Sequence, residues 1–163
     1  MPSKPAATSS LDVVNTTIDE AFAAFPPRQA QALRRTWDAA ARILSEGQPC
    51  ISWGMPTLRA AQDGPYVMSL MGFRHHNSLF PHSGAVAERL KDELGDRVIT
   101  KGTIHFDLEK PFPVALLRKV LAVRIEEVND SYPRRNGEVR VYNRNGSLRS
   151  VGKSTSESAR RAR

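Results

Sequence analysis

Three short segments of the 163-residue chain carry side chains that could bind a small ligand. Residues 52–56 read Ser-Trp-Gly-Met-Pro, in which Trp53 offers a flat apolar face and the glycine lets a ligand approach the backbone. The second segment contains Arg74 and His76, a fixed cation close to a side chain that titrates near neutral pH. The third, residues 101–103, reads Lys-Gly-Thr and offers an ammonium group and a hydroxyl to an anion.

These segments predict one small polar pocket. Six residues make it up: Trp53, Tyr66, Arg74, His76, Lys101 and Thr103. The expected ligand is a small anion, or a metal held together with an anion. Each segment also has a structural interpretation: residues 52–56 would bend one strand into the next with the tryptophan in the core, and residues 101–103 would form an ordinary hairpin turn.

The residue types that catalysis needs do not occur in a recognisable arrangement. Cys50, the single cysteine, stands in an apolar context that is typical of a core thiol. No two histidines have the His-x-His spacing that chelates a metal on one strand. The sequence also lacks a nucleophile-elbow, zinc-ligand or dinucleotide-binding motif, so we expect a binding protein that is not an enzyme.

Apolar periodicity predicts the elements that position these residues. Helical spacing predicts helices over residues 18–25, 28–45, 83–94 and 113–129. Short apolar and aromatic runs between Gly, Pro, Asp or Asn predict strands over residues 50–53, 57–60, 66–73, 77–81, 98–100 and 103–107. Because most strands follow one another without helical crossovers, the expected fold class is α+β, a compact two-layer sandwich with an antiparallel sheet flanked by helices.

The net charge of +7 comes entirely from the C-terminal part of the chain. Residues 1–130 contain fifteen Lys or Arg and fifteen Asp or Glu, whereas residues 131–163 contain nine basic and two acidic residues. We therefore expect a disordered segment at 1–15, a domain at 16–130 and a flexible basic tail at 131–163, in which an Asn-Gly pair favours a hairpin at 137–152. Two alternative functions follow from the tail: nucleic-acid binding through phosphate contacts, and strand addition to a partner protein.

The composition also bears on the compartment. The chain has no apolar run long enough to span a membrane, its N-terminus does not read as a secretory signal, and its single cysteine permits no internal disulfide. We expect a cytoplasmic protein without membrane contact.

Three motifs, taken in order, resemble one known family. They are Ile-Ser-Trp-Gly-Met-Pro at 51–56, Gly-Phe-Arg-His-His-Asn-Ser-Leu-Phe-Pro at 72–81, and Lys-Gly-Thr-Ile-His-Phe at 101–106, which leads into Lys-Pro-Phe-Pro at 110–113. Together they are similar to the bacterial YdhG-like family, whose domain is of unknown function and one branch of which is described as a frataxin-like intracellular iron chaperone. The resemblance covers about residues 17–130.

This resemblance implies a compact sandwich of an antiparallel sheet and flanking helices. It places Arg74 and His76 at the family's cation and histidine, and it suggests iron as a ligand or cargo. The segment at 137–152 separately resembles a lone MORN-type repeat, a kind of unit that normally stacks on neighbouring copies.

Overall fold

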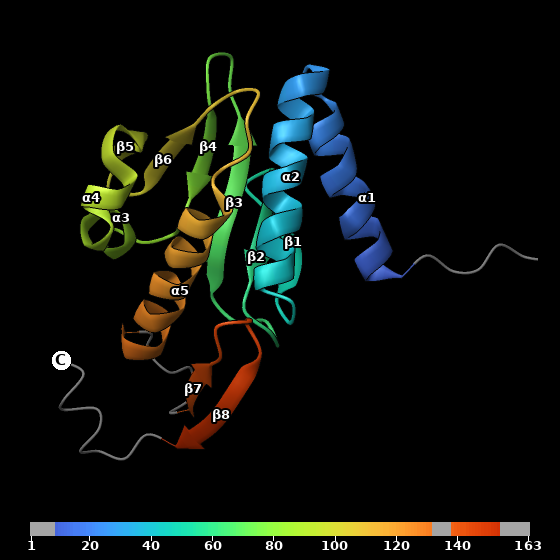
Figure 1. Cartoon of the computed structure of the whole chain (residues 1–163). Helices are drawn as coiled ribbons and strands as arrows, with labels where there is room; N and C mark the ends of the chain where they lie inside the picture. Colours follow the sequence, from blue (N-terminus) through green and yellow to red (C-terminus); the bar gives the residue numbers. More distant parts are fainter. Residues whose placement is uncertain (1–8, 132–137, 154–163) are drawn as a thin grey trace, which may run out of the picture.

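The computed structural model of the chain describes residues 9–131 and 138–153. Its centre is a six-stranded antiparallel sheet with the strand order β1-β2-β3-β4-β6-β5 (Figure 1). The strands are β1 (Gln48–Ser52), β2 (Met55–Arg59), β3 (Tyr66–Gly72), β4 (Asn77–Phe80), β5 (Val98–Thr100) and β6 (Thr103–Phe106). Strands β1 to β4 form a meander, and β6 returns to pair with β4, which leaves β1 and β5 at the two edges.

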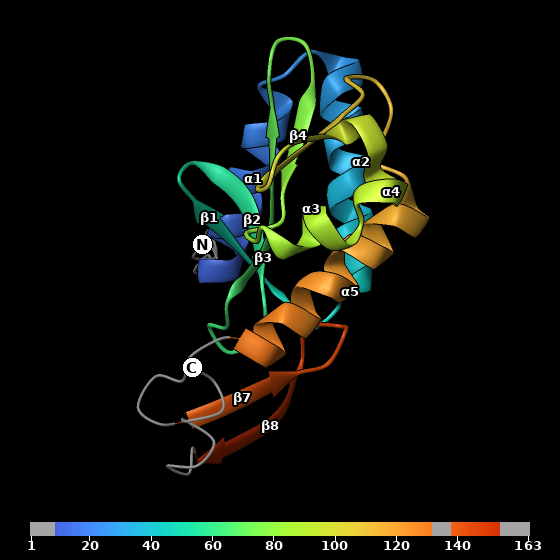
Figure 2. The same cartoon turned by 90° about the vertical axis from the view of Figure 1, so that its left-hand side faces the viewer.

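The helices form a second layer. They are α1 (Ser10–Ala23), α2 (Pro27–Ile43), α3 (Ala85–Arg89), α4 (Lys91–Leu94), the short 3-10 helix η1 (Gly95–Arg97) and α5 (Val114–Ser131). Helices α2 and α5 contact β3 on one side of the sheet, and α1 contacts β1 and β2 (Figures 1 and 2). The core lies between the layers, where Leu33, Leu70 and Leu121 are completely buried. None of the helices in the described ranges is long and apolar enough to cross a membrane.

This architecture confirms the expected α+β fold class, with a sheet that is antiparallel throughout. Two predicted helices differ in detail. The segment predicted as a continuous helix over residues 83–94 is interrupted at Leu90, where α3 ends and α4 begins.

The first helix begins eight residues earlier than the apolar pattern predicted, at Ser10 instead of residue 18. Ser9 starts it through a capping box: its hydroxyl accepts a hydrogen bond from the Asp12 amide at 3.1 Å, and the Asp12 carboxylate accepts one from the Ser9 amide at 3.2 Å. The first turns were missed because Leu11 and Val13 are about half exposed and mark no buried stripe. Of the segment expected to be disordered, residues 10–15 are therefore helical, and residues 1–8 lie outside the described ranges.

The predicted hairpin is present and consists of β7 (Glu138–Tyr142) and β8 (Leu148–Lys153). It packs against the domain. Tyr142 is only 4% exposed and belongs to the core, and its backbone is held by Asn129 of α5, which donates to the Tyr142 carbonyl at 2.9 Å and accepts from its amide at 2.8 Å. The amide of Ala61 donates to the carbonyl of Gly146 in the hairpin turn at 2.8 Å. The hairpin therefore packs on the domain that the sequence predicted to end at residue 130, and the boundary itself stays a prediction.

If the hairpin is part of the core, Tyr142→Ala should lower the free energy of unfolding by about 3 kcal/mol, the usual cost of deleting a buried aromatic ring. The matched control is Val151→Ala on the paired strand, where the side chain is about half exposed and the change should stay within about 0.5 kcal/mol. Urea denaturation of the full chain measures both values. Equal, small effects would show that the hairpin is an appendage, as the sequence had suggested.

Candidate functional site

One side of the sheet has no helix layer of its own. Successive residues of a strand point to opposite sides, and Leu58, Leu70 and Leu79 point into the core under the helices. In Figure 2, α2 and α5 lie on one side of β3 and β4. On the other side, the Met71 and Phe80 side chains are partly exposed. We call this second side the open face. Its residues across β2, β3, β4 and β6 are Thr57, Ser69, Met71, Ser78, Phe80 and His105.

A chain of hydrogen bonds crosses the open face. Thr57 Oγ1 lies 3.0 Å from the carbonyl oxygen of Met55 and 2.6 Å from Ser69 Oγ. Ser69 Oγ lies 2.7 Å from His82 Nε2. A carbonyl only accepts and each hydroxyl has one proton, so all three contacts are satisfied when Thr57 donates to Met55 and accepts from Ser69. Ser69 then accepts from His82, which assigns the Nε2–H tautomer to that histidine.

The direction of these hydrogen bonds bears on catalysis. A serine nucleophile needs a base that accepts its proton, whereas Nε2 of His82 donates to Ser69. Ser69 is also fully buried, and its oxygen is already engaged by Thr57 and His82. Burial and the nearby positive charge of Arg124 lower the pKa of His82, which keeps the ring neutral at pH 7. The Ser69–His82 pair is therefore not arranged as a nucleophile and its base.

Ser78 lies in the middle of the open face, opposite Met71 on β3 and His105 on β6. Its Oγ is fully buried and has no hydrogen-bond partner among the described residues. A buried hydroxyl without a partner costs about 1–3 kcal/mol, and such groups are uncommon in folded proteins. Among the hydroxyls of the open face, Ser78 is thus the one at which a ligand that accepts a hydrogen bond would gain the most binding free energy.

Histidine rings border this hydroxyl. The His105 ring stacks on His76 with the centroids 3.6 Å apart, and His76 stacks in turn on Phe73 at 5.0 Å. Burial and the neighbouring His76 lower the pKa of His105. His105 is therefore neutral at pH 7 and offers one donor and one acceptor nitrogen on the strand beside Ser78.

Three of the six residues predicted for the pocket lie on or beside the open face. His76 stacks on His105, Thr103 shares the His105 side of β6, and the Tyr66 ring contacts the His82 ring at 5.4 Å. The guanidinium of Arg59 lies over the Tyr66 ring, 5.3 Å from its centroid.

The other three lie in hairpin turns. Trp53 is in the β1–β2 turn and is 93% exposed, so it is not a core residue. Arg74 is exposed in the β3–β4 turn, and Lys101 is exposed in the β5–β6 turn beside Gly84. The β1–β2 and β5–β6 turns are separated by four strand spacings, roughly 20 Å. The structure therefore does not bring all six residues into one pocket, and the binding role of each stays a prediction.

Sequence reasoning missed three polar residues on or beside the open face, which are Ser69, Ser78 and His82. A faint signal existed, because Ser69 and Met71, like Ser78 and Phe80, are two residues apart and must share a side of their strands. Which serine faces which neighbour depends on the strand register, and that appears only in the folded sheet. No three His, Cys, Asp or Glu side chains within residues 9–131 and 138–153 lie close enough to hold a metal ion.

The fold and this face define an α+β sandwich that carries buried hydroxyls and histidine rings on the side of the sheet opposite α2 and α5. A crystal structure of YdhG from Bacillus subtilis, a protein of the DUF1801 family, is similar to it, with a TM-score of 0.61 over 69% of this chain and 90% of that chain. At 15% sequence identity the likeness establishes a shared fold. It agrees with the YdhG-like fold expected from the three motifs and does not bear on the frataxin-like branch or the MORN-type repeat. No protein-family model matches the chain, and no curated protein matches its sequence.

Two serine substitutions test the assignment of the unpartnered hydroxyl. Ser78→Ala removes a buried group without a partner and should leave the free energy of unfolding unchanged or raise it by up to about 1 kcal/mol. Ser69→Ala, at equal burial on the next strand, removes a bonded hydroxyl and should lower it by about 1–2 kcal/mol. Chemical denaturation compares the two variants. Equal destabilisation by both would mean that Ser78 Oγ already has a partner.

Acid should destabilise the folded chain below neutral pH. The pKa values of His82 and His105 are lowered in the folded state, so the unfolded chain binds more protons once the pH falls below the unfolded histidine pKa of about 6.5. The contribution of these two histidines to the free energy of unfolding is therefore fully present above that pH and declines as the pH falls below it. Thermal melts at about pH 7.5 and pH 5 should show a larger fall in Tm for the wild type than for His82→Gln/His105→Gln. The same fall in both proteins would assign the effect to other groups.

Proposed function

We propose that the chain is a binding module, without catalytic activity of its own, that holds a small ligand on the open face of the sheet. The observation that carries this proposal is the buried hydroxyl of Ser78, which has no partner among the described residues. The hydroxyls of Thr57 and Ser69, in contrast, are saturated by each other and by His82. A ligand that accepts a hydrogen bond from Ser78 would remove a penalty that the free protein carries.

The chemistry around Ser78 indicates the class of ligand. Its hydroxyl donates, and neutral His105 supplies a second donor on the neighbouring strand. Met71 and Phe80 supply an apolar surface on the same face. This set suits a small carboxylate with an apolar body, which agrees with the anionic ligand expected from the sequence. To reach Ser78 the ligand must displace a covering side chain, and Met71, which has a flexible unbranched side chain, is the simplest to move.

Two observations support binding without catalysis. In the hydrogen-bonded chain, His82 donates to Ser69 and so does not act as its base. Burial raises the pKa of the Cys50 thiol, so the sulfur stays protonated at neutral pH and is a poor nucleophile.

Three further hypotheses from the sequence rest on other parts of the chain. Iron carriage would need a ligand group that the described residues do not form. Nucleic-acid binding and strand addition depend on the basic tail, of which residues 154–163 lie outside the described ranges. These three stay predictions, as does the cytoplasmic location.

A titration of the full-length, ¹⁵N-labelled chain with benzoate and hexanoate tests the proposal. Chemical-shift changes should be centred on β3, β4 and β6 around Ser78, and Ser78→Ala should weaken binding about tenfold, the value of one hydrogen bond. The matched control is Ser150→Ala, an exposed serine on β8, which should bind as the wild type does. The proposal is wrong if neither carboxylate shifts the open-face resonances at about 10 mM, the range of weak ligands.

A further inference from the structure

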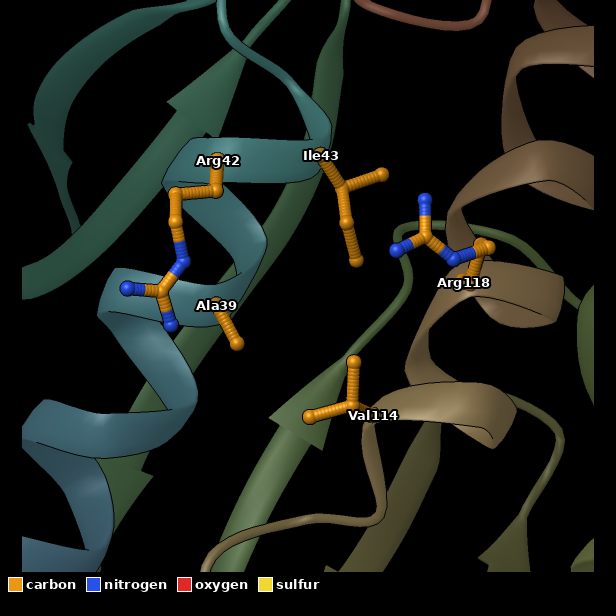
Figure 3. Close-up of a pocket in the computed structure, with 5 residues that line it drawn as sticks. All are labelled: Ala39, Arg42, Ile43, Val114 and Arg118. Atoms are coloured by element: carbon orange, nitrogen blue, oxygen red, sulfur yellow. The ribbon is translucent and has the colours of Figure 1, made fainter.

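A second, separate feature lies in the helix layer, on the other side of the sheet from Ser78. The C-terminal half of α2 and the first turns of α5 form the two sides of a groove, a cavity of about 170 Å³ that is partly open to solvent (Figure 3). Its five lining residues are Ala39, Arg42, Ile43, Val114 and Arg118. The helical spacing explains the set, because residues three or four apart share a helix face. Each helix contributes one arginine.

The lining of the cavity combines three apolar side chains with two arginines. In Figure 3 the side chains of Ile43 and Val114 point into the gap between the helices, and the guanidinium of Arg118 extends from α5 towards Ile43. The Arg42 side chain lies along α2 beside Ala39, on the side of α2 away from Arg118, so it must turn towards the gap to share a ligand with Arg118. Val114 is 50% exposed although it is a large apolar residue at the start of a helix. An exposed valine between two arginines suits a ligand with both an apolar and an anionic part.

Neither arginine has a hydrogen-bond or ion-pair partner among the residues that the structure describes. Two acidic residues close to these arginines in the chain or the fold are paired with other cations. Asp38, one turn before Arg42, pairs with Arg34, and Glu93 pairs with Lys119, the residue after Arg118. Most other arginines of the described ranges have such a partner, as Arg89 has in Glu126. Two positive charges therefore line one groove, one from each helix, and both would attract an anion bound there.

We infer that the groove between α2 and α5 binds a small phosphate monoester whose apolar part is about the size of one aromatic ring. Phosphate suits the two guanidinium groups, because each can donate two parallel hydrogen bonds to its oxygens. The volume matches the body of the ligand, since a cavity of about 150 Å³ accommodates benzene. This site does not depend on the open face, and the two bind different anions through different groups.

The test uses phenyl phosphate as the probe, titrated into the full-length chain by calorimetry at low and moderate salt. The wild type should bind it saturably and more tightly than inorganic phosphate, which lacks the ring. Arg42→Gln and Arg118→Gln should each weaken binding about tenfold, the usual effect of losing one charge-assisted hydrogen bond. Neither should change Tm, because exposed side chains without partners contribute little stability.

The matched control is Arg97→Gln in η1, which removes the same charge from an exposed arginine far from the groove in the chain. It should bind as the wild type does, and so should Ser78→Ala, which separates this site from the open face. The inference is overturned if the wild type shows no saturable binding of phenyl phosphate. It is also overturned if Arg97→Gln loses as much affinity as the two groove variants, because the attraction would then come from net charge alone.

Discussion

The helices α2 and α5 cover one side of the six-stranded sheet. This one-sided cover determines which residue types the strands carry on each side. On the covered side the strands supply leucines and other apolar residues to the core. On the open side the sheet must shield its own backbone, and it does so with small hydroxyl residues packed between larger neighbours. Because a buried hydroxyl is costly without a partner, such a surface is stable only when its hydroxyls bond to one another. Thr57 and Ser69 meet that condition, whereas Ser78 does not.

The elements of the fold could be predicted because each has a local signal. Apolar residues at helical spacing identify α2 and α5, and the Asn145-Gly146 pair identifies the turn between β7 and β8, where Gly146 has a φ of 85°. Two features had no such signal. The start of α1 depends on a capping box and not on a buried stripe. The attachment of the hairpin depends on Asn129 and Tyr142, whose mutual hydrogen bonds form only after both elements are in place.

The candidate site was harder to predict for a related reason. The motifs around Trp53, Arg74 and Lys101, from which it was predicted, coincide with the turns of three hairpins. The buried hydroxyls of the open face instead lie in mid-strand, at serines that a sequence does not distinguish from ordinary ones. Ser69 and Ser78 become notable only through the pairing of β3 with β4 and of β4 with β6. A strand register is a long-range property, and a shift by one residue would have turned every one of these side chains to the core.

The β1–β2 turn has a consequence for spectroscopy. Trp53 and Gly54 both have positive φ, 53° and 74°, as a two-residue type I′ turn requires, and this conformation holds the indole in solvent. The other tryptophan of the chain, Trp37, is 6% exposed and packs edge-on against Phe22 in the helix layer. The two indoles therefore report on different things. A soluble quencher such as iodide reaches Trp53 alone in the native state, so the quenched fraction of the emission follows the surface around the turn and the protected fraction follows the packing of the core.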